Sequence, residues 1–196
     1  MEDFDPAQDC GLDEVGRGPL AGPVCAASVI LGPNFPLEIL ADSKKLSEGQ
    51  RETAFPVILE RAVAWGVGWV WPAEIDAINI HRASLLAMER AFAAMKYTPR
   101  AAFVDGLYCP PLGIPSFAVV KGDDKIPAIS AASIIAKVIR DRWMVRWSWI
   151  DDRYGFEKHK GYPTEFHRRA LDLHGPSGIH RRSFQFKVPW NLELGF

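Results

Sequence analysis

The stretch that most constrains the fold of this chain is residues 11–22, which read GLDEVGRGPLAG. Its apolar start, two adjacent carboxylates and following glycines predict a strand that ends in a tight loop, because glycine tolerates backbone angles that other residues avoid. Neighbouring strand residues point to opposite faces, so Asp13 and Glu14 reach one site only where the strand ends or twists. The stretch therefore predicts two acids at a strand end, beside a loop of exposed backbone.

Hydrophobic periodicity predicts a mixed α/β domain, in which three strands precede helix–strand–helix units. The expected elements are strands over 10–14, 23–31, 62–71, 101–104 and 116–120, and helices over 47–61, over 72–97 and from Ser130 onward. The first three strands suit an antiparallel set. In the third, large side chains alternate with mostly small ones, which gives that strand two unlike faces.

Three local signals refine the helices. Ser47 and Gln50 have the spacing of a capping box, whereas Pro56 predicts a break or kink in the same helix. Ser130 is a good N-cap residue for the last long helix. Periodicity then places Trp149 on the inward face of that helix, together with Ile134, Ile135, Val138 and Val145.

Length and composition exclude several protein classes. A chain of 196 residues that is 48% hydrophobic and 24% charged suits one globular domain. The sequence has neither a signal peptide nor an apolar run long enough to cross a membrane, so we expect a cytoplasmic protein without a membrane partner. The three cysteines show no disulfide or metal-binding spacing.

Charge is distributed unevenly along the chain. Residues 1–60 hold 4 basic and 11 acidic side chains, whereas residues 137–187 hold 12 basic and 6 acidic ones. A chain of near-zero net charge can still present one basic face to a polyanion. Two ordinary solvated surfaces explain the same asymmetry equally well.

Acidic residues end three of the predicted strands, as Asp13-Glu14, Asp105-Gly106 and Gly122-Asp123. Carboxylates beyond strand ends lie where an α/β sheet usually places its ligand site. Clustered carboxylates without Cys or His select Mg²⁺ or Mn²⁺, and two such ions can drive phosphodiester hydrolysis. The alternative is that each acid is a turn residue or helix cap, and spacing alone does not decide between the two.

Two further stretches suit recognition of a nucleic acid. Arg17, between Gly16 and Gly18, can reach a phosphate while the bare backbone approaches a ribose 2′-OH. Tyr162 lies in the basic stretch KHKGYP and can stack on a sugar or base. The alternatives are a tight turn with a solvated arginine and a tyrosine that covers the core.

The segment around Ser43, Lys44 and Lys45 offers a hydroxyl and two cations to a phosphate. It reads equally as a loop before a helix.

Taken together, these stretches resemble the ribonuclease HII family. Eight pieces appear in the order of the family and span nearly the whole chain, which makes the resemblance very specific. The pieces are GLDEVGRGPLAG (11–22), DSKKLS (42–47), IDAINI (75–80), VDG (104–106), VVKGD (119–123), ISAASIIAK (129–137), HKGYPT (159–164) and RRSF (181–184).

The resemblance implies a ribonuclease H-like fold in a single catalytic domain over 1–196, with residues from about 151 to 196 as a helical C-terminal extension. It implies cleavage of the RNA strand of RNA/DNA hybrids and incision at ribonucleotides embedded in duplex DNA, leaving 5′-phosphate and 3′-hydroxyl ends. The four catalytic and metal-binding carboxylates of the family map onto Asp13, Glu14, Asp105 and Asp123. Asp123 is preferred to Asp124 because it directly follows Lys-Gly.

The resemblance further assigns recognition of the junction between a ribonucleotide and the next deoxyribonucleotide to Gly16, Arg17, Gly18 and Tyr162. We expect two Mg²⁺ or Mn²⁺ ions to bind with substrate, and a monomeric enzyme. The C-terminal residues NLELGF loosely resemble peptides that bind the bacterial sliding clamp, although a tail folded back onto the domain is the alternative.

Three rival interpretations remain. A resolvase or transposase core shares strand-end carboxylates but lacks the Gly16-Arg17-Gly18 loop and its paired Tyr162. A non-catalytic hybrid-binding module would not need all four acids. Ribonuclease HIII usually carries an extra N-terminal domain, and since nine residues precede Cys10 here, we expect that domain to be absent.

Overall fold

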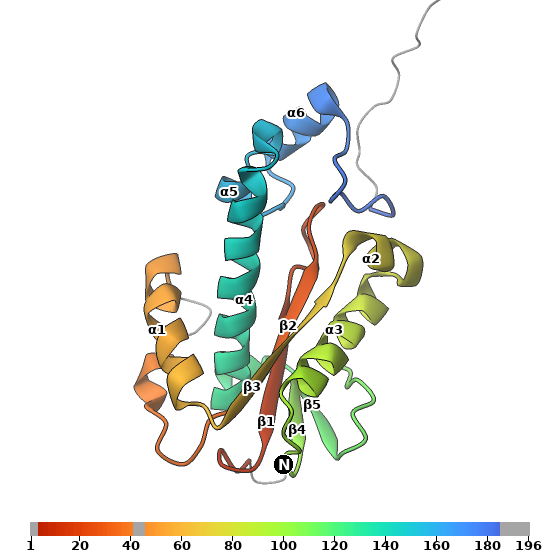
Figure 1. The fold of residues 1–196 in the computed structure, drawn as a ribbon. Helices are drawn as coiled ribbons and strands as arrows, with labels where there is room; N and C mark the ends of the chain where they lie inside the picture. The colour runs from red at the N-terminus through yellow and green to blue at the C-terminus, as the bar shows by residue number, and fades with distance from the viewer. Residues whose placement is uncertain (1–3, 41–45, 185–196) are drawn as a thin grey trace, which may run out of the picture.

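The computed structural model describes residues 4–40 and 46–184, which form a five-stranded sheet between two layers of helices (Figure 1). The strands are β1 (Cys10–Val15), β2 (Val24–Ile30), β3 (Ala64–Val70), β4 (Ala102–Asp105) and β5 (Ser116–Val119). Their order in the sheet is β3-β2-β1-β4-β5. The antiparallel set β1–β2–β3 is confirmed, and β4 and β5 add parallel to β1.

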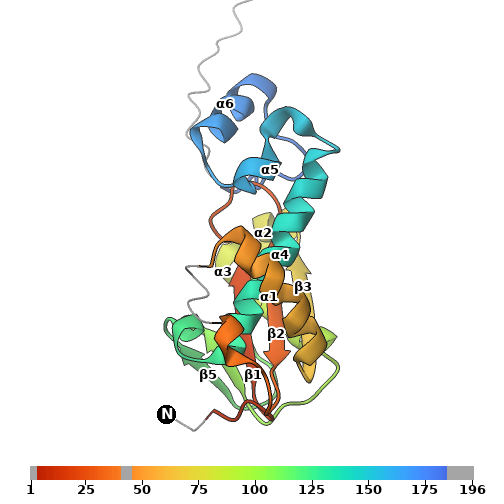
Figure 2. The same ribbon diagram turned by 90° about the vertical axis from the view of Figure 1, so that its left-hand side faces the viewer.

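Four of the α-helices belong to the sheet layers, and two follow them. They are α1 (Glu48–Arg61), α2 (Pro72–Ile78), α3 (Ile80–Ala94), α4 (Pro127–Ser148), α5 (Phe156–His159) and α6 (Glu165–His174). Short 3₁₀ helices are η1 (Leu37–Leu40), η2 (Gly122–Asp124) and η3 (Asp152–Tyr154). Figure 2 shows α1 and α4 on one face of the sheet, with α5 and α6 beyond its end.

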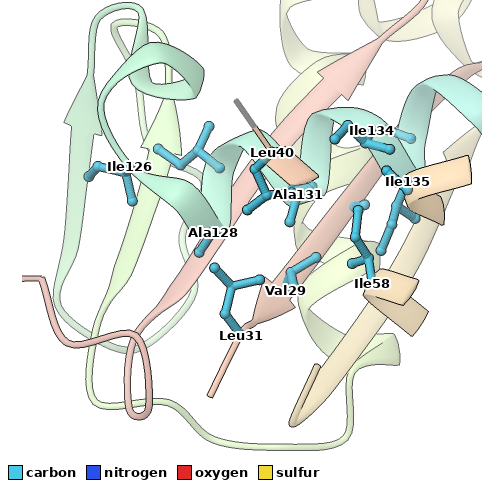
Figure 3. Close-up of a cluster of buried hydrophobic side chains, with 14 of the residues drawn as sticks. Val29, Leu31, Leu40, Ile58, Ile126, Ala128, Ala131, Ile134 and Ile135 are labelled. Atoms are coloured by element: carbon cyan, nitrogen blue, oxygen red, sulfur yellow. The ribbon is translucent and has the colours of Figure 1, made fainter. Parts of the chain in front are cut away.

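The main core lies between the sheet and the layer of α1 and α4. Figure 3 shows Val29 of β2 and Leu31, just after that strand, in one cluster with Ile58 of α1 and with Ile134 and Ile135 of α4. All five side chains are at most 1% exposed. Burial of such aliphatic side chains contributes about 1.5–3 kcal/mol each, so this layer fixes α4 against the central strands.

The opposite face of the sheet packs against α3, through the small-residue face of β3. A Cβ atom added to Gly68 would lie 2.1 Å from the carbonyl oxygen of Ala87, so only glycine allows this approach. The buried side of α3 is likewise small, with Ala83, Ala87 and Ala91 fully buried. The larger tryptophans of β3 therefore lie on the other, partly exposed side of the strand.

A third cluster joins the loop after β1 to the C-terminal helices. Ala21 packs there with Met144 of α4, with Tyr154, and with Leu171 of α6. The cluster holds the β1–β2 loop against segments that lie more than a hundred residues later in the sequence.

The structure confirms one local signal and corrects another in α1. Ser47 and Gln50 form the expected capping box, with the Gln50 amide donating to Ser47 Oγ at 3.3 Å. The expected break at Pro56 is wrong, because α1 continues through it to Arg61. Buried Phe55 and Ile58 on either side of the proline hold the helix against the core.

The single helix expected over 72–97 is two helices. Asn79 separates them with a positive φ of 70°, ending α2 and capping α3. Its Oδ1 accepts from the amides of His81 at 3.0 Å and Arg82 at 3.1 Å. Residues other than glycine rarely combine a positive φ with a ψ near 163°, so the two hydrogen bonds to Oδ1 help to hold this strained turn.

Two expectations for α4 are wrong. The helix begins at Pro127, so Ser130 lies inside it and donates from Oγ to the Leu40 carbonyl at 3.2 Å. Trp149 is 77% exposed rather than inward. With 22 residues α4 is about 33 Å long, so its last turn extends past the sheet and leaves Trp149 without a core to enter.

Candidate active site

The acids at three predicted strand ends lie side by side at one end of the sheet. Because β1, β4 and β5 are parallel neighbours, their C-terminal ends point the same way. Asp13 and Glu14 lie near the end of β1, Asp105 ends β4, and Asp123 lies in η2, just after β5. This edge is where the strand order predicted a ligand site.

A hydrogen bond ties the second and third acidic segments together. The Gly122 amide donates to Asp105 Oδ1 at 2.7 Å. A Cβ atom on Gly122 would lie 2.6 Å from Ile129 Cδ1, so glycine allows η2 to approach both α4 and Asp105. The next residue, Asp123, is buried and Asp124 is exposed.

Burial and like charge act together on the acids of β1. The pKa of Asp13 is raised well above its usual value, first by burial and then by the negative charges of Glu14 and Asp105. Burial also raises the pKa of Glu14, although the Arg17 guanidinium opposes that shift. The three carboxyl groups are therefore close enough to repel one another.

The donor chemistry of this edge suits a hard divalent cation. All the candidate ligands are carboxylate oxygens, which favour Mg²⁺ or Mn²⁺ over softer metals. A cation would offset the repulsion that raises the Asp13 pKa. Within residues 4–40 and 46–184, however, no three His, Cys, Asp or Glu side chains already form a metal-holding group.

A small pocket of about 80 Å³ opens beside the acids. Glu14, Arg17 and Asp105 line one part of it. His81 and Tyr108 line another part, with their rings in an edge-on contact at 4.8 Å. The two acids and the loop arginine therefore face the same space.

The predicted recognition residues meet on the loop that follows β1. Arg17 Nη1 lies 3.2 Å from Glu14 Oε1, so the loop arginine contacts one of the acids. A Cβ atom on Gly18 would lie 3.6 Å from Tyr162 Cε1, which places the tyrosine ring against the bare backbone. Lys137 Nζ lies 5.8 Å from the centre of that ring. Arg17, Gly18 and Tyr162 are all exposed.

The same loop is paired to the C-terminal part of the chain. The Leu20 amide donates to the Gly161 carbonyl and the Gly22 amide to the Ile179 carbonyl, both at 2.8 Å. A Cβ atom on Gly161 would lie 2.5 Å from the Ala21 carbonyl oxygen, so glycine permits the contact. Figure 1 shows the β1–β2 loop reaching toward α5 at this end of the sheet.

Two buried arginines beneath the loop escaped the sequence interpretation. Arg140 Nε donates to the Pro23 carbonyl at 2.8 Å, Nη1 to Lys160 at 3.0 Å and Nη2 to Ala21 at 3.1 Å. Arg181 donates from Nε to the Gly22 carbonyl at 2.9 Å, from Nη1 to Arg17 at 3.0 Å and from Nη2 to Gly16 at 2.5 Å.

Both arginine side chains have no measurable exposure. Burial lowers the pKa of each, that of Arg181 to about 9, and the charge of Arg140 adds to the effect on Arg181. An available signal was helical spacing, because Arg140 lies four residues after Ala136 and four before Met144, and both of these are buried.

Three histidines support the backbone at Tyr162. The Ser177 amide donates to His180 Nδ1 at 2.9 Å, so the proton of neutral His180 is on Nε2. That nitrogen lies 2.9 Å from His167 Nε2, and His167 Nδ1 lies 2.9 Å from the Tyr162 carbonyl. His159 stacks on His167 at 4.5 Å. Burial lowers the pKa of His167 to about 4 and that of His180 to about 3.

Some predicted residues lie outside the described part of the chain. These are Ser43, Lys44 and Lys45, and the C-terminal residues 190–196. Among the described residues, no helix has both the length and the apolar character needed to span a membrane.

A family model and a curated relative match this chain, and both carry the same description. The family model described as Ribonuclease HII matches residues 10–187. A curated Ribonuclease HII from Dechloromonas aromatica (strain RCB) is 54% identical over 175 residues, which cover 89% of each chain.

Two solved structures share the fold at low sequence identity. The ribonuclease H2 of Pyrococcus horikoshii OT3 has a TM-score of 0.76 at 26% identity, covering 91% of this chain and 94% of that one. The PCNA:RNase HII complex from Archaeoglobus fulgidus gives 0.78 at 28% identity, covering 92% and 96%.

Proposed function

Because this chain belongs to the ribonuclease HII family, we propose that it incises duplex DNA at embedded ribonucleotides, using two divalent cations held by its four strand-end carboxylates. Family membership establishes the coarser activity. The protein is a ribonuclease H, a metal-dependent hydrolase that cleaves the RNA strand of RNA/DNA hybrids.

The four proposed ligands have different roles. Asp13 and Asp105 are the central ligands, since their side chains interact across the neighbouring ends of β1 and β4. Glu14 and Asp123 complete the ligand set or help to move protons. The burial of Asp123, next to the glycine that donates to Asp105, supports its choice over exposed Asp124.

The reaction is hydrolysis of one phosphodiester. Bound Mg²⁺ or Mn²⁺ ions would lower the pKa of the attacking water and offset charge on the departing oxygen. Water attacks phosphorus in line, the bond from phosphorus to the 3′-oxygen breaks, and that oxygen takes up a proton. The products are a 5′-phosphate and a 3′-hydroxyl. Asp13, Glu14 and Asp105 hold the negative charge that this arrangement needs.

Selection of the ribonucleotide falls to the loop after β1. Gly16, Arg17 and Gly18 supply backbone groups to the 2′-OH and a cation to phosphate. Tyr162 stacks on the sugar that follows. Ser43, Lys44 and Lys45, outside the described residues, are proposed to contact phosphate.

The observation that supports the proposal is that the proposed catalytic acids and the proposed recognition residues lie together at one strand end. Arg17 contacts Glu14 at 3.2 Å, and the ring of Tyr162 lies against Gly18 in the same loop. A ribose seated on Gly18 is therefore held a few residues from the acids. A resolvase or transposase core has no need for that arrangement.

The proposal is tested by cleavage of a DNA duplex that contains a single ribonucleotide. We expect incision at that ribonucleotide, measured with Mg²⁺ and with Mn²⁺, and none on an all-DNA duplex of the same sequence. Equal cleavage of both duplexes would favour a general metal nuclease. Binding without cleavage would favour a hybrid-binding module.

A second proposal concerns the C-terminal tail. One structural relative was solved as a complex with PCNA, and the sequence NLELGF of this chain loosely resembles clamp-binding peptides. We propose that residues 190–196 bind a sliding clamp and that the free enzyme is monomeric. Deletion of 190–196 should abolish binding to the clamp and leave cleavage intact. Unchanged binding would favour the alternative of a tail folded onto the domain.

A further inference from the structure

The guanidinium groups of Arg140 and Arg181 are buried charges whose hydrogen-bond partners are backbone carbonyls. Among the described residues, neither arginine forms an ion pair with a carboxylate. Their partners are six carbonyl oxygens, five of them between Gly16 and Pro23. Leaving a buried charge without partners is costly, so these bonds strongly restrict the conformation of the loop.

The contacts of Arg181 also set the orientation of two peptide groups. It binds the carbonyl oxygens of Gly16 and Arg17, which therefore point toward the buried guanidinium. In a planar trans peptide the C=O and the following N–H point in opposite directions, and none of the peptide bonds in residues 4–40 and 46–184 is cis. The amides of Arg17 and Gly18 thus point away from Arg181, at residues that are exposed.

These two amides form a pair of adjacent donors on the loop over residues 16–23, which we call the recognition loop. Neither donates a hydrogen bond to another residue in the described part of the chain. The next amides differ, since Leu20 and Gly22 donate to Gly161 and Ile179. The loop therefore offers a short stretch of available donors between stretches of paired backbone.

Arg140 links the loop after β1 to the segment that contains Tyr162. Its guanidinium joins the carbonyls of Ala21 and Pro23 to that of Lys160, two residues before Tyr162. One buried group thereby fixes the spacing between the loop after β1 and the chain at Lys160, next to Tyr162.

We propose that Arg181 and Arg140 are positioning residues for ribonucleotide selection. Arg181 turns the amides of Arg17 and Gly18 outward as a paired donor for the ribose 2′-oxygen or the adjacent phosphate, and Arg140 holds Tyr162 at the matching distance. The inference rests on the proposed function, because it explains how the loop that selects the ribonucleotide keeps its shape.

The first test compares Arg181→Lys with the protein as it is. Lysine keeps the positive charge and loses the planar fork that binds several carbonyls. The measured quantity is the ratio of kcat/KM on a single embedded ribonucleotide to kcat/KM on a continuous RNA/DNA hybrid. We expect this ratio to fall by about tenfold or more, because the amides of Arg17 and Gly18 lose the bonds that orient them. A general loss of folded enzyme would lower both values equally and leave the ratio unchanged.

Arg182→Met is the matched control, since Arg182 is the exposed neighbour of Arg181. It should leave the ratio within about twofold. Arg140→Lys should lower the ratio in the same direction as Arg181→Lys. A folded Arg181→Lys protein with an unchanged ratio would overturn the inference. If the unmutated enzyme showed no incision at a single ribonucleotide, the proposed function itself would fail.

The second test needs no variant. Amide hydrogen exchange of the free protein should be fast at Arg17 and Gly18 and slow at Leu20 and Gly22. A ribonucleotide-containing duplex with a non-cleavable linkage should slow exchange at Arg17 and Gly18, whereas an all-DNA duplex should not. Slow exchange at both amides in the free protein, or no change with the ribonucleotide duplex, would overturn the inference.

Discussion

The two halves of the site are stabilised in opposite ways. At the acid edge, Asp13, Glu14 and Asp105 repel one another, and burial strengthens the effect. At the recognition loop, buried Arg140 and Arg181 bind six carbonyl oxygens. A bound cation would offset the repulsion in the first half, whereas hydrogen bonds within the protein hold the second half. Under the proposed function, the protein alone sets the recognition geometry, and a bound cation would complete the catalytic geometry.

The largest expected effect comes from Asp13→Asn. It should lower cleavage on the order of a thousandfold, because a central charge that holds the cations is lost. Binding to hybrid should remain. The same change should stabilise the metal-free protein by about 1 kcal/mol, since a buried and repelled charge is removed. Cleavage assays and chemical denaturation measure the two effects, and retained activity would contradict the assignment.

Tyr162→Ala should have the next largest effect. Loss of stacking is worth about 1–3 kcal/mol, so incision at a single ribonucleotide should fall by about fivefold to 150-fold. Tyr162→Phe keeps the ring and should lose less. Tyr97→Ala, an exposed tyrosine beyond α3, is the control. If Tyr162→Ala changed only binding to plain DNA, the recognition role would be wrong.

Acid should weaken the recognition half first. His167 and His180 have folded pKa values of about 4 and about 3, below the usual 6.5. The unfolded chain therefore binds protons more readily, and stability that is present above pH 6.5 is lost as the pH falls toward 4. Asp151 opposes the shift at His180, and the neighbouring His159 adds to the shift at both.

Thermal melting between pH 7 and pH 5 measures this effect. His180→Gln should lower the melting temperature at pH 7 and flatten its dependence on pH. His174→Gln, at an exposed position, should keep the dependence of the unmutated protein. An unchanged slope in His180→Gln would show that acid acts elsewhere.

The smallest expected effect is that of Lys137→Met. Lys137 lies over the Tyr162 ring at 5.8 Å and pairs with Asp141 at 2.9 Å. A cation–π contact at a partly exposed site is worth about 0.5–1 kcal/mol, so affinity for a single-ribonucleotide duplex should fall about two- to fivefold. Lys158→Met, which removes a similar contact with Phe166 at 5.8 Å, should leave that affinity unchanged.

Local signals in the sequence determined much of the fold. The capping box at Ser47 and the antiparallel order of the first three strands depend on neighbouring residues and on periodicity, and both are confirmed. The positions of Asp13 and Asp105 at strand ends, and of Asp123 shortly after β5, follow from the same kind of pattern. Short-range hydrogen bonds and alternating burial are encoded where they act, so a single sequence exposes them.

Tertiary structure alone decided which carbonyls Arg140 and Arg181 bind. Their partners in the recognition loop lie 117 to 165 residues away, and no spacing in the sequence encodes such a pairing. Trp149 is a second example. The helical spacing of apolar residues predicted that its side chain is buried, but α4 extends past the sheet and leaves it exposed. Sequence determined which residues are near the chemistry, while packing over long separations decided which way the backbone beside it faces.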